Sequence, residues 1–498
     1  MEPTGGDGDG EIAAKIANPS SSGGEDRLSA LPDEIIVLIL LHLPTAEAAR
    51  TRVLSRRWRR IWPLLPELRF PEAPEPPQRL RAILEAHEAA LRYLHVGTRG
   101  AAPDPLAAWL PAAARRLTGC LVLQNVDLGQ NAEGDGEAEA ALELPCFERA
   151  TAISLDLGFL RVDLPLPRAG VFARLTELNL LHVRFRIPWL LGDVVSWWRC
   201  PCLQKLMVSN TWGLDDLSIQ SKSLLRLEMT KNRGLRRLSI WAPELKDLWV
   251  LYCFFVDKNQ PVVTISTPQL VSLNWWDAYD PSSFYTDKME HLRSLSALYF
   301  RVYGPHGSTH NQNCLRLLWR FKVIESLFLA LVYPPAIDNY QYLMEDMTIL
   351  PHIKFLHLTV LANGHAFGAS SFHVLRLCSG ITRLKLEFRP SSDFQAHTCQ
   401  SGCNCDEQPN WEAEELLLNH LQEVEITELS SEREVAFVRR LFNWAKTLKK
   451  MTVTFQSCVT ESMVKEFHQV LRSFSRPEIC MEFHWYKDRI KLLYAPID

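Results

Sequence analysis

The sequence contains no long hydrophobic run. Its most apolar stretch, Ile35 to Leu41 within LPDEIIVLILLHL (31–43), is far shorter than the roughly 18 residues that a membrane-spanning helix needs. The opening stretch MEPTGGDGDGEIAAK is acidic and lacks the apolar core and cleavage site of a secretory signal. We therefore expect no membrane partner and residence in the cytoplasm, the nucleus or both, where thiols stay reduced.

A strong excess of one charge is also missing. The chain has 54 Lys and Arg against 58 Asp and Glu among 498 residues, a net charge of −4. This balance gives no overall attraction to nucleic acid. The arginines of RTRVLSRRWRR (50–60) alternate with apolar positions of a predicted helix, without the aromatic platform of a nucleic-acid site. We therefore predict no nucleic-acid partner.

Recognisable catalytic motifs are lacking too. The sequence has no phosphate-binding Gly-x-x-x-x-Gly-Lys-Ser/Thr, no His-Glu-x-x-His and no Gly-x-Ser-x-Gly. Its acidic residues and histidines are spread without convergent spacing. We predict a non-catalytic protein with no catalytic residues and no cofactor.

A repeat, Leu-x-x-Leu-x-Leu with other apolar residues allowed, dominates the chain. Most steps between copies measure 21–29 residues, which is the period of leucine-rich repeats. The last two apolar residues of a copy share one face of a short strand, so the copies must stack into a parallel sheet to bury that face. The copies are LRYLHV (91–96), LTELNL (175–180), LQKLMV (203–208), LLRLEM (224–229), LKDLWV (245–250), LVSLNW (270–275), LSALYF (295–300), IESLFL (324–329), IKFLHL (353–358), ITRLKL (381–386), LQEVEI (421–426) and LKKMTV (448–453), with weaker ones at 117–122 and 150–155.

Two further copies lie halfway between the main ones. LDDLSI (214–219) and LRRLSI (235–240) are 21 residues apart, like their neighbours. We interpret them as a second short strand on the opposite wall of each coil, with little helix in that section. The alternative is a coincidence of spacing.

The C-terminal region changes its pattern. SSEREVAFVRRLFNWAKT (430–447) and TESMVKEFHQVLRSF (460–474) have helical apolar spacing, and ICMEFHWY (479–486) alternates like a strand. Ser431 and Glu434 form a capping-box pattern at the first helix. The region predicts a strand–helix–strand–helix–strand cap for the end of the repeats.

The apolar segment near the N-terminus raises a packing problem. Its predicted helix runs from Pro32 to about His42 and is apolar on all sides. A second predicted helix, 46–62, places Val53, Leu54, Trp58, Ile61 and Trp62 along one face. One short neighbour cannot cover both faces of the first helix, so either the chain's own repeats or a partner protein must cover the second face.

The stretch LSALPDEIIVLILLHLPTAEAARTRVLSRRWRRIWPLLPELRF (28–70) resembles an F-box, because Leu-Pro-Asp-Glu, an apolar helix, Leu-Pro and Val-Leu-Ser-Arg-Arg-Trp-Arg occur in order. The whole chain resembles the plant F-box/leucine-rich-repeat proteins with a C-terminal FBD-like region. The resemblance implies docking on a Skp-family adaptor, with a cullin and a RING subunit contacted indirectly. It places these residues in or beside the adaptor interface: Leu31, Pro32, Ile35, Ile36, Ile39, Leu43, Pro44, Val53, Leu54, Ser55 and Trp58.

These patterns predict an α/β fold, namely a short helical F-box, a leucine-rich-repeat solenoid and a C-terminal α/β cap. The expected division is a disordered leader (1–26), the F-box (27–70), a Pro-rich linker (71–80), the solenoid (81–414) and the FBD-like cap (415–490).

The open surface of the predicted sheet offers a place for a protein target. We predict that Trp249, Trp276, Tyr299 and Phe328 form a nearly continuous exposed aromatic patch across four coils. Basic residues beside it could contact an acidic group of the target. The predicted target-binding set is Trp249, Trp276, Tyr299, Arg301, Phe328, His357 and Lys385. In the alternative interpretation, loops or the C-terminal cap cover this patch as ordinary core.

One cluster offers metal ligands. HTCQSGCNCDE (397–407) contains His397, Cys399, Cys403 and Cys405, which could hold a tetrahedral zinc ion. The spacing is not that of paired Cys-x-x-Cys knuckles, and the cluster falls in the longest gap between repeats. We therefore favour a reduced loop with no metal.

These expectations converge on the substrate-recognition subunit of an SCF-type (Skp–cullin–F-box) ubiquitin ligase. In that hypothesis the F-box docks on the adaptor and the repeats capture a protein target of unknown identity. The alternative is an interaction scaffold that does not direct degradation. A small-molecule sensor is less favoured, because no basic pocket recurs at repeat-related positions.

Overall fold

The computed structural model divides the chain into two compact units, unit 1 (Met1–Leu65) and unit 2 (Pro66–Asp498). The predicted leader, 1–26, lies outside the described residues. The structure describes residues 31–126, 141–163, 170–185, 190–254, 261–277, 279–321, 324–389, 399, 403, 405, 411, 413–487 and 490–494.

Unit 1 is built of short helices. Its elements are α1 (Asp33–Leu41), α2 (Thr45–Arg50), η1 (Thr51–Val53), α3 (Arg56–Ile61) and η2 (Trp62–Leu64). Asp33 and Glu34 occupy the first turn of α1, where the helix dipole favours negative charge. The α1 side chains of Ile36 and Leu40 are fully buried and help to form the core of this unit.

The prediction of one helix over 46–62 is wrong. Ser55 adopts an extended backbone conformation, with φ −162° and ψ 169°, and caps the N-terminus of α3. Its side chain accepts a hydrogen bond from the backbone N–H of Trp58 at 3.4 Å. This break resets the helical phase, so Val53 and Leu54 are exposed while Trp58 and Ile61 are buried.

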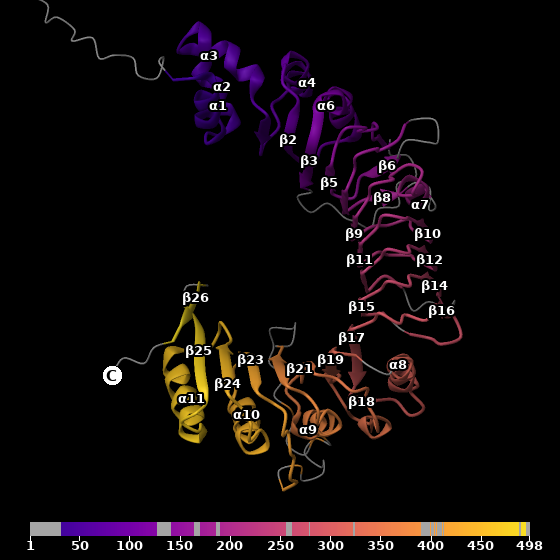
Figure 1. Ribbon diagram of the computed structural model, residues 1–498, viewed down its shortest axis with the longest axis vertical. Coiled ribbons are helices and arrows are strands. Elements are labelled where there is room, and N and C mark those ends of the chain that lie inside the picture. Colours follow the sequence, from indigo (N-terminus) through magenta and orange to yellow (C-terminus); the bar gives the residue numbers. More distant parts are fainter. Residues whose placement is uncertain are drawn as a thin grey trace, which may run out of the picture. The chain divides into compact units, whose positions relative to one another are not determined.

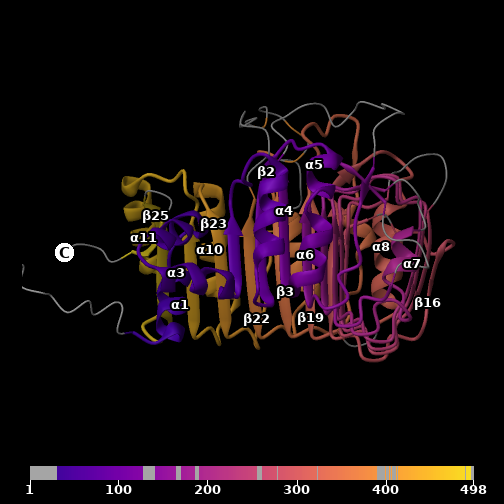
Figure 2. The same cartoon turned by 90° about the horizontal axis from the view of Figure 1, so that it is seen from above.

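Unit 2 is organised around one long sheet, in which every pairing is parallel except the last (Figures 1 and 2). Each strand of this sheet pairs with the next one along the chain, as stacked coils require. The 17 strands among the described residues are β1 (Glu67–Phe70), β2 (Leu91–Arg99), β3 (Leu117–Val126), β5 (Ala152–Asp156), β7 (Glu177–Leu181), β9 (Lys205–Ser209), β11 (Arg226–Thr230), β13 (Asp247–Leu251), β15 (Ser272–Trp275), β17 (Ser294–Arg301), β19 (Ser326–Val332), β21 (Phe355–Leu361), β22 (Arg383–Phe388), β23 (Glu423–Leu429), β24 (Lys450–Phe455), β25 (Cys480–Lys487) and β26 (Ile490–Leu493).

The repeat pattern sets the core of unit 2. Each predicted copy coincides with a strand of the long sheet, which confirms the predicted leucine-rich-repeat solenoid. In β13, for example, Leu248 and Val250 are fully buried while Trp249 between them is half-buried. The buried face packs inside the coils, and the residues between the apolar positions form an open face.

The half-step copies are strands of a second parallel sheet. Its strands are β10 (Asp216–Gln220), β12 (Arg237–Trp241), β14 (Val262–Ser266) and β16 (Phe284–Thr286). The register pairs Leu217 with Leu238, 21 residues later, as the spacing predicts. The prediction of two strands per coil and little helix in this section is therefore confirmed.

Helices and short strands complete the other coils of unit 2, on the side of the long sheet opposite its open face (Figure 1). The helices of unit 2 are α4 (Pro77–Ala86), α5 (Pro103–Ala107), α6 (Leu110–Arg116), α7 (Leu190–Val194), α8 (His310–Trp319), η3 (Met344–Asp346), α9 (Gly368–Leu377), α10 (Glu432–Trp444) and α11 (Glu461–Phe474). The short strands are β4 (Leu142–Glu143), β6 (Arg161–Asp163), β8 (Arg184–Phe185), β18 (Tyr303–Gly304) and β20 (Gln341–Tyr342). Among the described helices, we find none with the length and apolarity needed to cross a bilayer.

The C-terminal region extends the long sheet. β23, α10, β24, α11 and β25 follow in the predicted order. The capping box at Ser431 and Glu434 is formed in both directions. β26, which the sequence pattern did not predict, pairs antiparallel with β25 at the end of the sheet.

The segment predicted as a linker is part of unit 2. β1 pairs with β2 before the Pro-rich stretch begins, so the sheet starts earlier than the predicted solenoid. The backbone N–H of Ala73 donates to the carbonyl of Gly97 in β2 at 2.7 Å. A Cβ at Gly97 would fall 2.1 Å from the carbonyl oxygen of Pro71, so this close approach requires glycine. Helix α4 then begins at Pro77.

Candidate functional site

Among its described residues, unit 1 exposes six large apolar side chains, two of which lie on one face of α1. Ile35 and Leu38 are three residues apart and share a helical face, with exposed fractions of 40% and 55%. Val53 in η1 and the following Leu54 are exposed by 81% and 61%. We call this set the α1 surface: Ile35, Leu38, Leu43, Val53, Leu54 and Leu64.

The structure sorts the predicted adaptor-binding residues. Ile36 and Trp58 belong to the core of unit 1, and Ser55 caps α3. The others are exposed or half-buried: Leu31, Pro32, Ile35, Ile39, Leu43, Pro44, Val53 and Leu54. Leu38 and Leu64 are exposed apolar residues that the sequence analysis did not select. Helical phase from Ile35 would have identified Leu38.

A hollow of about 390 Å³ lies on the open face of the long sheet, and we call it the open-face groove. Along one row of the sheet, Trp249, Asn274, Ser296 and Phe328 pair in register across β13, β15, β17 and β19. Asn274 and Ser296 are small and buried, whereas the two rings stand at either end. Three strand steps of about 4.8 Å put those strands about 14 Å apart. The groove exists because two small residues separate two large ones.

The predicted continuous aromatic patch is wrong at Tyr299. A β-bulge between Ser296 and Leu298 shifts the register, so Tyr299 pairs with Ala330 rather than with Phe328. The ring of Tyr299 lies against His310, with centroids 4.3 Å apart. The same shift pairs Arg301 with Val332, and neither Tyr299 nor Arg301 lines the groove.

Trp276 does line the groove, together with an aromatic residue that the repeat pattern missed. Tyr252 follows β13 in a left-handed conformation, with φ +54°, and its ring lies 6.2 Å from that of Trp276. Among the described residues, none after Arg389 in the chain lines the groove. The C-terminal cap therefore does not supply its walls.

A polar network closes one end of the groove around Glu387. This carboxylate contacts His357 Nε2 at 3.1 Å, and Thr359 Oγ1 and Arg389 Nε donate to it at 3.0 and 2.9 Å. These contacts, above all the one with His357, lower the pKa of Glu387 to about 2 although burial opposes the shift. The groove thus combines aromatic walls with a fixed charged end.

Two of the three basic residues predicted to contact an acidic target group, His357 and Lys385, are already paired. His357 contacts Glu387, and Lys385 Nζ lies 3.0 Å from Glu425. Lys385 lies outside the open-face groove, beside β23. Arg389 also pairs with Glu387, at 2.9 Å, but its side chain is half-exposed and lines the groove, so it is the cation best placed to meet a bound group.

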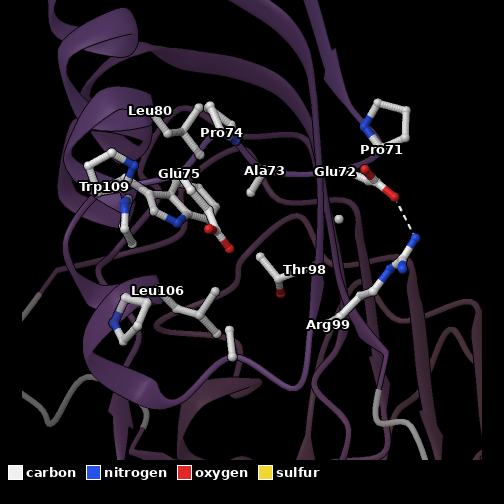
Figure 3. Close-up of a pocket in the computed structure, with 15 residues that line it drawn as sticks. Pro71, Glu72, Ala73, Pro74, Glu75, Leu80, Thr98, Arg99, Leu106 and Trp109 are labelled. Atoms are coloured by element: carbon white, nitrogen blue, oxygen red, sulfur yellow. Dashed lines mark hydrogen bonds and ion pairs between the residues drawn. The ribbon is translucent and has the colours of Figure 1, made fainter.

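Unit 2 has a second hollow beneath its Pro-rich stretch, with a volume of about 860 Å³. Figure 3 shows Leu80, Leu106 and Trp109 on one side of it. On the other side, Arg99 pairs with Glu72. No residue of the predicted binding sets lines this hollow.

Comparisons with known proteins agree with this arrangement. Residues 28–69 match the F-box domain family. Residues 106–286 match the family described as "FBD-associated F-box protein At5g56370, LRR repeats". The chain thus contains one region similar to an F-box and one similar to the leucine-rich repeats of FBD-associated F-box proteins. Most of the F-box match falls in unit 1, and the repeat match falls in unit 2.

The chain is also similar to F-box proteins of Arabidopsis thaliana. The chain is 25% identical to the putative F-box/FBD/LRR-repeat protein At4g03220 over 475 residues, which cover 90% of this chain and 92% of that protein. It is 30% identical to the F-box/FBD/LRR-repeat protein At2g04230, over 45% of this chain and 53% of the relative. It is 27% identical to the F-box protein At3g03040, over 66% of this chain and 70% of that protein.

Proposed function

We propose that this protein is a substrate-recognition subunit of an SCF-type ubiquitin ligase. The observation that carries the proposal is the α1 surface, a set of apolar side chains that the described residues leave exposed in the region that matches the F-box family. Burying a large aliphatic side chain contributes about 1.5–3 kcal/mol, so a partner that covers Ile35, Leu38 and Val53 gains several kcal/mol. A Skp-family adaptor is that partner, and it connects the chain to a cullin and a RING subunit.

The repeat unit is the target-binding part in this proposal. Its open-face groove has aromatic walls and a fixed charged end, the composition of protein-binding hot spots. Trp249, Trp276 and Phe328 from the predicted set line the groove with His357. The protein supplies proximity between the target and the ubiquitin-transfer machinery and performs no chemistry itself.

Residence in the cytoplasm, the nucleus or both is part of the same proposal. No disulfide joins any of the 12 cysteines, all of which lie among the described residues, and the sulfurs of Cys399 and Cys405 lie 3.4 Å apart, well beyond the length of a disulfide bond. Free thiols are typical of compartments in which glutathione and thioredoxin keep cysteine reduced.

Adaptor binding tests the proposal directly. We expect the full chain to co-purify with a recombinant Skp-family adaptor and Leu38→Glu to weaken that binding by at least about tenfold, because a buried carboxylate would replace an apolar contact. The measurement is a titration by biolayer interferometry. Leu38 is exposed in the free chain, so the variant leaves the core of unit 1 intact.

A matched control is Ile349→Glu, which places the same charge at an exposed apolar residue of unit 2. This control should bind the adaptor like the wild type. Equal binding by Leu38→Glu, Ile349→Glu and the wild type, or no adaptor binding by the wild type, would contradict the proposed role.

A further inference from the structure

His365 meets three cysteines from a segment more than thirty residues later in the chain. It lies in the turn between β21 and α9, whereas Cys399, Cys403 and Cys405 precede β23. One ligand atom from each of the four residues lies within 4.8 Å of every other. His397, which the sequence analysis grouped with these cysteines, lies outside the described residues. The structure therefore supplies a different histidine.

The distances between the donor atoms fit a tetrahedral ion. Cys399 Sγ lies 3.3 Å from His365 Nδ1 and 3.4 Å from Cys405 Sγ, and Cys403 Sγ lies 3.6 Å from His365 Nδ1. Zinc with Zn–S bonds of about 2.3 Å and a Zn–N bond of about 2.0 Å separates two sulfurs by about 3.8 Å, and sulfur from nitrogen by about 3.6 Å. The three distances differ from these values by no more than a few tenths of an ångström, and no two of the four donor atoms lie more than 4.8 Å apart.

The surroundings hold two of the ligands in place. His365 is only 5% exposed, and its ring stacks on Tyr333 with centroids 6.0 Å apart and an interplanar angle of 20°. The backbone N–H of Ala366 donates to Cys405 Sγ at 3.5 Å, the kind of outer contact that orients a ligand. Cys405 is also buried.

A second anchor lies six residues beyond Cys405. The Trp411 ring packs between Phe437 and Trp444, with centroids 5.5 and 6.1 Å away. A Cβ at Gly368 would fall 2.3 Å from this ring, so glycine allows the contact with the start of α9. Two neighbouring parts of the chain are therefore contacted by this later segment. The cysteines lie against the turn that contains His365, and Trp411 lies against the start of α9.

We propose that His365, Cys399, Cys403 and Cys405 bind one zinc ion that fastens this segment to the β21–α9 turn. Three thiolates and one imidazole are a ligand set of structural zinc sites. A disulfide would join only two of the sulfurs, at about 2.05 Å, and would leave His365 without a role. Four protein ligands leave no open position, so the ion stabilises the fold and takes no part in chemistry.

Metal content of the full-length protein tests the proposal. We expect about one zinc per chain by inductively coupled plasma mass spectrometry after purification without chelators. Cys399→Ser with Cys405→Ser should reduce the zinc to background. Cys458→Ser with Cys480→Ser changes two exposed cysteines outside the cluster and should retain it.

Cobalt spectroscopy keeps the test decisive if the double variant folds poorly. The wild-type chain, stripped of metal and titrated with Co²⁺ alone, should develop sulfur-to-cobalt charge-transfer bands and intense visible bands of tetrahedral geometry. His365→Ala should weaken cobalt binding by at least about tenfold. The wild type binding neither zinc nor cobalt, equal zinc in the two double variants, or a Cys399–Cys405 disulfide in protein alkylated at lysis would overturn the proposal.

Discussion

Glu387 is shared by three side chains that line the open-face groove. His357, Thr359 and Arg389 all contact its carboxylate, and the side chain is only 17% exposed. These contacts favour the charged form, and they lower its pKa from 4.5 to about 2. The charged carboxylate therefore stabilises the folded state, and it also fixes the direction of Arg389 in the groove.

Acid titration of Glu387→Gln tests this contribution. A carboxyl with a depressed folded-state pKa contributes stability that is present above its unfolded pKa and is lost as the pH falls through its folded pKa. For Glu387 that window runs from about pH 5 down to about pH 1. The unfolding free-energy difference between the wild type and Glu387→Gln should shrink by about 2 kcal/mol between about pH 5.5 and pH 3. Urea unfolding of unit 2 at both pH values measures it.

Glu425→Gln is the matched control for that titration. Glu425 pairs with Lys385 on the same sheet, but its side chain is 47% exposed. Exposed ion pairs contribute at most about 1 kcal/mol, so Glu425→Gln should lower the free energy of unfolding by no more than about that amount. A difference for Glu387→Gln that is equal at both pH values would refute the assigned role of the network.

At the residue scale, the sequence predicts which face of a strand a side chain occupies better than it predicts which other side chains that residue contacts. Strand alternation was enough to place Trp249 and Phe328 on the open face. Alternation could not place Tyr299, because the bulge between Ser296 and Leu298 adds one residue to the strand. Nothing in the local sequence predicts this bulge. His365 was missed because its partners are more than thirty residues away, and only the stacking of coils brings them together.

At the scale of elements, local hydrogen bonding decides where helices begin. The capping box of α10 follows directly from Ser431 and Glu434 and was predictable. Ser55 caps the N-terminus of α3 in the same way. The sequence analysis missed this cap because the helical pattern of apolar residues is not interrupted there. The apolar period continues across Ser55, so periodicity alone cannot locate the break.

Glu434→Ala tests how much the capping box contributes to α10. The Glu434 carboxylate accepts from the backbone N–H groups of Ser430 and Ser431 at 2.6 and 3.0 Å. Removing it leaves both N–H groups unsatisfied at a cost of about 1–2 kcal/mol. Amides in the first turn of α10 should exchange about tenfold faster in hydrogen–deuterium exchange mass spectrometry.

The control for the capping box is Glu432→Ala, in the same turn. Glu432 is exposed and contributes through the helix dipole alone, so the expected change is about twofold. Similar exchange rates in the two variants would show that the reciprocal hydrogen bonds do not hold this helix end.

At the scale of the whole molecule, the two proposed binding surfaces lie in different units. The α1 surface belongs to unit 1 and the open-face groove to unit 2. The solenoid was predictable because every coil repeats one pattern, and the F-box was predictable because its motifs are local. The shape of the groove was not, since it depends on which residues neighbouring strands bring into one row.

This separation predicts that the two binding activities can be removed independently. Trp249→Ala with Trp276→Ala should abolish labelling of groove-dependent proteins by a proximity-biotinylation fusion of the full chain, because two aromatic hot-spot residues contribute about 2 kcal/mol or more each. Adaptor binding should be unchanged.

Trp241→Ala is the control, since this exposed tryptophan lies on β12 in the other sheet. Some proteins should lose their labelling only in the double variant. The cellular levels of these proteins should rise in cells that express Leu38→Glu, as they should under proteasome inhibition, because this variant captures them but does not lead to their ubiquitylation. An unchanged labelling profile in the double variant would remove the groove as the target site.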